Sequence, residues 1–90
     1  MARTRYSLYS KEYKGLLTRL REARAGAAVT QVELAKRLRT EQSVISKLER
    51  GVVRMDLLDL ISYLRAIDAD PVQFVAEVVK DLGSERGKRR

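Results

Sequence analysis

The amino-acid sequence predicts an all-α fold, a compact bundle of five helices that forms one domain. Apolar residues recur at intervals of three and four along most of the chain, and no segment alternates apolar and polar residues as a half-buried strand does. Ser, Thr or Asp precedes most of these periodic segments, and such residues favour the N-cap position of a helix. A chain of 90 residues can build one hydrophobic core but not two.

The N-terminal part of the chain is expected to contain an arm followed by the first helix. Ser10 is the predicted N-cap, and an apolar stripe then runs from Tyr13 to Ala23 at helical spacing. Residues 1–9 carry basic and aromatic side chains, and two interpretations of them are open. They form either a frayed end that folds back onto the first helix or a basic arm that enters a minor groove. The domain itself is predicted to span residues 10–83.

Two short helices are predicted between Thr30 and Gly51. Thr30 and Glu33 have the spacing of a capping box, so the first of these helices should begin directly after Thr30. Thr40 or Glu41 is the expected N-cap of the second, and Gly51, which tolerates a left-handed conformation, is expected to end it. The expected apolar positions are Leu34, Ala35 and Leu38 in the first helix and Val44, Ile45 and Leu48 in the second. Two such helices with a brief link are typical of a helix-turn-helix.

Two further helices are predicted in the C-terminal half. Asp56 is the expected N-cap of the fourth helix, and Asp70–Pro71 is a strong start signal for the fifth, because Asp favours the N-cap and Pro the first helical position. The fifth helix is expected to span residues 71–82 and to end at Gly83. Residues 84–90 are expected to form a disordered basic tail.

The fifth helix carries more apolar side chains than one packing face needs. The side chains concerned are Phe74, Val75, Val78, Val79 and Leu82, together with Val72. We hypothesise that part of this face forms a two-fold homodimer. The alternative is that the helix only completes the core of the monomer.

The charge distribution indicates a polyanionic partner for the N-terminal half. The net charge is +7, with seven Lys or Arg against two acids in residues 1–24 and six against three in residues 25–54. The balance reverses to two against six in residues 55–83 and returns to four against one in the last seven residues. A basic face of this kind attracts nucleic acid, although an ordinary soluble surface rich in Lys and Arg would show the same excess.

The composition argues against several other classes of function. The chain has no His and no Cys, so the common catalytic triads, zinc sites and haem sites cannot be built, and we expect neither an enzyme nor a metal or other cofactor. The N-terminus lacks the apolar segment of a signal peptide, and no apolar run approaches the length of a membrane span. We therefore expect a cytoplasmic protein that does not bind membranes.

The segment from Thr30 to Gly51 resembles the Cro and phage-repressor type of helix-turn-helix, the XRE family, and the resemblance extends from roughly Leu16 to Pro71. The residues that carry it are Gln31, Glu33-Leu34-Ala35, Gln42-Ser43, Ile45-Ser46 and Glu49-Arg50-Gly51. The chain departs from the family pattern in having Arg39 where the turn usually has a small residue, and in a link over residues 25–29 that is about three residues longer. Either the first helix runs an extra turn or the loop bulges. The resemblance implies a lambda-repressor-like fold and a sequence-specific DNA-binding transcriptional regulator, a repressor that binds an inverted-repeat operator as a homodimer.

Helix 42–50 is the expected recognition helix, inserted into the major groove. Its predicted base-reading residues are Gln42, Ser43, Ser46 and Lys47, which lie opposite the apolar positions. Gln42 is suited to adenine and Lys47 to guanine, because their hydrogen-bonding groups match those base edges. The predicted phosphate contacts are Gln31, Arg39, Thr40, Arg50 and Arg54. The resemblance further implies that Arg21 pairs with Glu49; the alternative is two solvated charges of little energetic importance.

A different class of function is compatible with the same features. An antitoxin-type interaction module would hold a partner protein through its acidic, apolar C-terminal half and would use the helix-turn-helix to regulate its own promoter. Copurification with a protein partner would distinguish this alternative from a homodimeric repressor.

Overall fold

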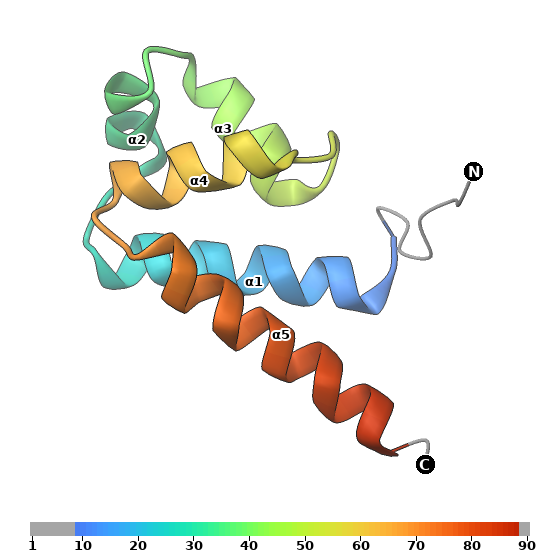
Figure 1. Cartoon of the computed structure of the whole chain (residues 1–90). Helices are drawn as coiled ribbons and strands as arrows, with labels where there is room; N and C mark the ends of the chain where they lie inside the picture. The colour runs from blue at the N-terminus through green and yellow to red at the C-terminus, as the bar shows by residue number, and fades with distance from the viewer. Residues whose placement is uncertain (1–8, 89–90) are drawn as a thin grey trace.

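The computed structural model describes residues 9–88, and it describes side chains as far as Gly83. The described residues form five helices and no strand, which confirms the predicted all-α fold (Figure 1). The helices are α1 (Lys11–Gly26), α2 (Gln31–Arg37), α3 (Gln42–Arg50), α4 (Leu57–Ala66) and α5 (Pro71–Lys88). Residues 1–8 of the predicted arm lie outside the described residues.

The arrangement of the helices leaves one side of α3 uncovered. Helix α3 packs against α2 and α1, while α4 contacts α2 and α5. In Figure 1, α2, α3 and α4 lie together on one side of α1, and α5 extends away from α2 and α3. None of the helices in the described part of the chain is long and apolar enough to cross a membrane.

Side-chain caps start four of the helices, as the sequence predicts. Ser10 accepts a hydrogen bond from the Tyr13 N–H, and Asp56 forms a complete capping box with Asp59. Asp70 accepts from the N–H of Val72 at the start of α5. These bonds satisfy backbone donors that have no partner within their helix.

The predicted capping box at the start of α2 is only half formed. The Thr30 hydroxyl accepts from the Glu33 N–H at 3.0 Å, but the Glu33 carboxylate accepts from Arg37 one turn further along the helix. A cation at this spacing competes for the carboxylate that the box would need. Glu41, rather than the alternative Thr40, is the N-cap of α3, and its side chain makes no capping hydrogen bond.

Three links contain a non-glycine residue in the left-handed region, namely Ala28, Arg39 and Asp68. Helix α1 continues to Gly26, so its extra length, rather than a bulged loop, accounts for the longer link, and Ala28 then has φ 59°. Arg39, between α2 and α3, has φ 57° and thus takes the conformation that glycine favours in such a turn. Gly51 ends α3 with φ 76°, as predicted.

The end of α5 differs from the prediction. The helix passes through Gly83 and continues to Lys88, so most of the predicted tail is helical. A glycine inside a helix costs about 1 kcal/mol relative to alanine, and it ends a helix only when the following backbone turns away. Residues 89–90 lie outside the described residues.

The hydrophobic core draws on every helix. Its buried members are Tyr13, Leu17, Leu20, Val29, Leu34, Ala35, Ile45, Met55, Tyr63, Leu64, Ile67 and Phe74. Phe74, which we predicted in a dimer interface, is only 9% exposed and belongs to this core. Val78 packs against the same cluster, so the inner stripe of α5 completes the monomer, while Val75 and Val79 remain exposed.

Candidate nucleic-acid interface

The outward side of α3 carries polar side chains. Gln42, Ser43 and Lys47 are exposed and Ser46 is half-buried, whereas Ile45 is completely buried against the core. The structure therefore places the four predicted base-reading residues where a ligand can reach them. A helix with this distribution fits a major groove, which has room for one helix.

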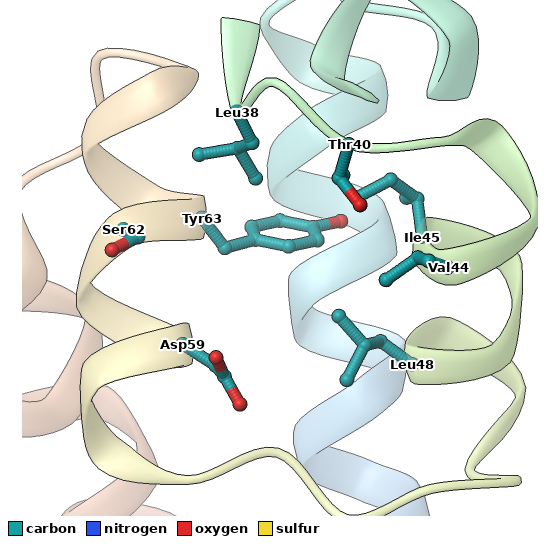
Figure 2. A pocket seen from close by; sticks show the side chains of 8 residues that line it. All are labelled: Leu38, Thr40, Val44, Ile45, Leu48, Asp59, Ser62 and Tyr63. Carbon is teal, nitrogen blue, oxygen red and sulfur yellow. The ribbon is translucent and has the colours of Figure 1, made fainter. Parts of the chain in front are cut away.

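The apolar side of α3 is less completely covered than we predicted. Val44 is 41% exposed, because it borders a groove of about 270 Å³ between α3 and α4. Figure 2 shows Val44 and Leu48 of α3 across this groove from Asp59 and Ser62 of α4, with the ring of Tyr63 extending between the two helices. The hydroxyl of Tyr63 donates to the carboxylate of Glu49 and so joins α4 to α3.

A chain of hydrogen bonds fixes Gln42 at the start of α3. Its side-chain amide donates to Oε1 of Gln31 at 2.6 Å, and Nε2 of Gln31 donates to Oε1 of Glu49 at 2.9 Å. Both polar ends of the Gln31 amide are occupied, so its orientation is determined. Gln42 is consequently held by α2 before any ligand arrives. Its side chain therefore loses less conformational entropy when a ligand binds.

The carboxylate of Glu49 is the centre of this arrangement. Its side chain is 1% exposed and forms a two-bond pair with Arg24, from Nε at 2.7 Å and from Nη2 at 2.9 Å. The hydroxyl of Tyr63 donates to the same carboxylate. Arg24 also donates to the carbonyl oxygen of Val29, so it joins α1, the link to α2, and α3. A bidentate charged pair with added hydrogen bonds is the form in which a buried charge is tolerated.

The predicted ion pair between Arg21 and Glu49 is wrong. Arg21 donates instead to the main-chain carbonyl of Glu49 at 2.9 Å and to the hydroxyl of Thr18 at 3.2 Å. Arg24 lies three residues closer to α2 than Arg21 does. Three is also the number of residues by which the link over residues 25–29 exceeds the family pattern. Because Arg21 and Arg24 lie one turn apart on the same side of α1, the sequence marks both as facing α3. Tyr63 was missed as well, since its spacing in α4 marks only a core position.

The pKa values follow from this environment. Burial raises the pKa of Glu49, but hydrogen bonds from Arg24, Tyr63 and Gln31 and the positive charge of Arg24 outweigh it, so the pKa is lowered overall. The hydrogen bond to Glu49 raises the pKa of Arg24, and burial followed by the bond to Glu49 raises the pKa of Tyr63. At neutral pH the carboxylate is therefore charged, paired and turned away from any polyanion on the outer face.

Comparison with known proteins identifies the family of this chain. The chain matches the helix-turn-helix domain family over residues 16–76. It is 38% identical to an XRE-family like protein from Pseudomonas syringae pv. tomato, with a TM-score of 0.75 over 77% of this chain and 84% of that one. The chain belongs to the XRE-type helix-turn-helix family.

Further solved structures agree with this assignment. Two structures of the clp gene regulator ClgR from Corynebacterium glutamicum are similar to the chain, at 29% and 26% identity. The first has a TM-score of 0.68 over 80% of this chain and 94% of that one, and the second 0.69 over 89% and 85%. Among curated proteins, none is significantly similar in sequence.

The predicted phosphate contacts of this XRE-type protein flank α3 at both ends. Arg39 and Thr40 precede its start, where Gln42 bonds Gln31, while Arg50 is its last residue and Arg54 follows in the link to α4. The guanidinium of Arg50 donates to the hydroxyl of Ser46 at 3.0 Å. The guanidinium carbon of Arg54 lies 4.9 Å from the centre of the Tyr13 ring, a cation–π arrangement. Positive charge is thus available on either side of the polar face.

Proposed function

We propose that this DNA-binding regulator is a repressor that reads a double-stranded operator by inserting α3 into the major groove. The observation that carries the proposal is the chain from Gln42 through Gln31 to the buried Glu49. It holds an exposed amide at the start of a polar helix, the group that can pair with N6 and N7 of adenine. Lys47 supplies a donor suited to guanine, and Ser43 and Ser46 supply hydroxyls for bases or phosphates.

Phosphate contacts would set the depth and register of α3 in the groove. Gln31, Arg39 and Thr40 would hold one strand, and Arg50 and Arg54 the other. Such contacts contribute affinity that falls as salt rises, but they carry no sequence information directly. Repression would follow where the operator overlaps a promoter, because the bound protein then excludes other proteins from the same DNA.

We further propose that two copies bind an inverted repeat as a homodimer. Val72, Val75 and Val79 are exposed at a spacing of three and four on α5, beside the inner stripe that packs on the core. A symmetric helix pair would cover these side chains, and a two-fold dimer reads two half-sites about one helical turn apart. The same stripe would suit a different protein, as in an antitoxin, and copurification of a second polypeptide would favour that alternative.

Selection from a genomic-fragment library over a salt series tests the proposed function. We expect a short inverted repeat to be enriched and its affinity to fall steeply with salt. Gln42→Ala should lower discrimination at one base position by about 1 to 3 kcal/mol and leave the salt slope unchanged. Failure to bind DNA even at low salt would overturn the proposal, and binding without enrichment of any sequence would overturn operator recognition.

A further inference from the structure

A basic groove lies between α1 and the C-terminal end of α3, and Arg50 is the one predicted DNA contact among its lining residues. It has a volume of about 350 Å³, and its lining residues are Lys14, Leu17, Thr18, Arg21, Glu49 and Arg50. We call it the α1–α3 groove. Three of these six residues are cations, and Leu17 is buried beneath them. The groove thus combines an apolar floor with a positively charged rim.

The charge of Arg21 is held in place by neutral groups. Its guanidinium donates to a main-chain carbonyl, that of Glu49, and to the Thr18 hydroxyl, and neither acceptor carries a formal charge. The one carboxylate among the lining residues belongs to Glu49, which is buried and paired with Arg24. A fixed guanidinium without a carboxylate partner attracts an external anion, and its planar set of donors suits a phosphate.

The position of the groove favours the DNA backbone over a free anion. Arg50 lines the groove and also donates to Ser46 on the base-reading side of α3, so the groove and that side share an edge. When a helix fills a major groove about 12 Å wide, the two sugar-phosphate backbones run along its flanks. A backbone on this flank would pass over Arg50 toward α1.

We propose that the α1–α3 groove binds a phosphate of the operator backbone, with Lys14 and Arg21 of α1 as its cationic contacts beside Arg50. The inference rests on the proposed function and extends the DNA interface from the helix-turn-helix to α1. The side chains of the α1–α3 groove would touch no base, so they would contribute affinity and orientation. They add nothing to sequence preference.

The test is the salt dependence of DNA binding by the full chain. Lys14→Ala and Arg21→Gln should each lower the slope of log affinity against log salt by about 0.9, and the double variant by nearly twice as much. Affinity should fall by the same factor for operator and for unrelated DNA. Arg21→Lys keeps the charge and should retain most of the slope. Lys14 is exposed, so its removal carries the test without disturbing the fold.

Two matched controls remove the same charges elsewhere. Lys80→Ala changes an exposed lysine on α5, and Arg19→Gln changes an arginine of α1 that pairs with Asp81 of α5. Neither should alter the slope. If the unmodified chain binds with a steep salt slope and the Lys14 and Arg21 variants keep that slope, the α1–α3 groove is not a phosphate site. The proposed function then still stands. If the unmodified chain does not bind DNA, both proposals fall together.

Discussion

The hydroxyl of Tyr63 on α4 donates a hydrogen bond to the carboxylate of Glu49 on α3, and each side chain is only 1% exposed. The same carboxylate accepts from Arg24 of α1 and from Gln31 of α2. Four helices therefore meet at one buried charge, and Gln31 connects that charge to Gln42 on the outer face. The geometry of the predicted base contact therefore depends on the buried carboxylate of Glu49.

Tyr63→Phe should weaken the protein while leaving the ring in place. The variant removes a hydrogen bond to a charged group, which is worth about 1.5 to 3 kcal/mol in the free energy of unfolding. Urea unfolding would measure the loss. Tyr13→Phe is the matched control, since the Tyr13 hydroxyl accepts from the neutral N–H of Met55 and its loss should cost about 1 kcal/mol. Equal losses in the two variants would show that the bond from Tyr63 to Glu49 is no stronger than a neutral one.

Glu49→Gln should reduce stability and change its dependence on pH. The pKa of Glu49 is lowered in the folded state, so its stabilisation is present above the unfolded value near pH 4 and is lost as the pH falls through the folded value. At pH 7 the variant should lose about 3 to 5 kcal/mol, because Arg24 is left without its partner. The difference from the unmodified protein should shrink below about pH 4. A difference that stays constant from pH 7 to pH 3 would contradict the assigned pKa direction.

Local signals in the sequence predicted the fold and the outer face well. Ser10, Asp56 and Gly51 act within one turn of themselves, so their roles can be read from neighbouring residues. The polar face of α3 follows from helical periodicity alone. The half-formed capping box at Glu33 shows the limit of such rules, because Arg37 competes for the same carboxylate.

The buried charge cluster could not be predicted from spacing to the same degree. Arg21 and Arg24 lie on one side of α1, and only the packing of α1 against α3 decides which guanidinium reaches the Glu49 carboxylate and which its carbonyl. Tyr63 has the periodicity of any core residue, and its hydroxyl gains a role only from the position of α4. The division of α5 into a buried side at Phe74 and an exposed side likewise depends on tertiary contacts.

Arg39→Gly should stabilise the fold and weaken DNA binding. Arg39 has φ 57°, a conformation that costs a non-glycine residue about 1 kcal/mol or more, so glycine should raise the unfolding free energy by about 1 kcal/mol. The variant also removes a proposed phosphate contact, so the salt slope of binding should fall. Ala28→Gly is the control, since Ala28 has φ 59° and carries no charge: it should stabilise without affecting binding. Loss of stability in both variants would show that these turns do not strain the backbone.

Gln31→Ala should lower operator affinity through Gln42. Removing the Gln31 amide frees Gln42 to sample other rotamers, so Gln42→Ala should then cost less than it does in the unmodified protein. A double-mutant cycle on operator affinity should give a coupling of about 0.5 kcal/mol or more between the two positions. Gln73→Ala provides the control, because Gln73 bonds Glu77 within α5 and should be additive with Gln42→Ala. Additive effects of Gln31 and Gln42 would mean that the bond between them does not position the base contact.

The exposed stripe of α5 should control the oligomeric state. Val75 and Val79 are 39% and 59% exposed, and glutamate at either position would place a charge in a symmetric contact with its own copy. Val75→Glu combined with Val79→Glu should therefore sediment as a monomer where the unmodified chain sediments as a dimer. Leu58→Glu, on an exposed apolar residue of α4, is the control and should leave the dimer intact. If Leu58→Glu dissociates the dimer and the α5 variant does not, the interface lies at the start of α4, beside the exposed Val52 and Val53. Either monomeric variant should still bind a single half-site, because α3 and the cluster that supports it lie within one chain.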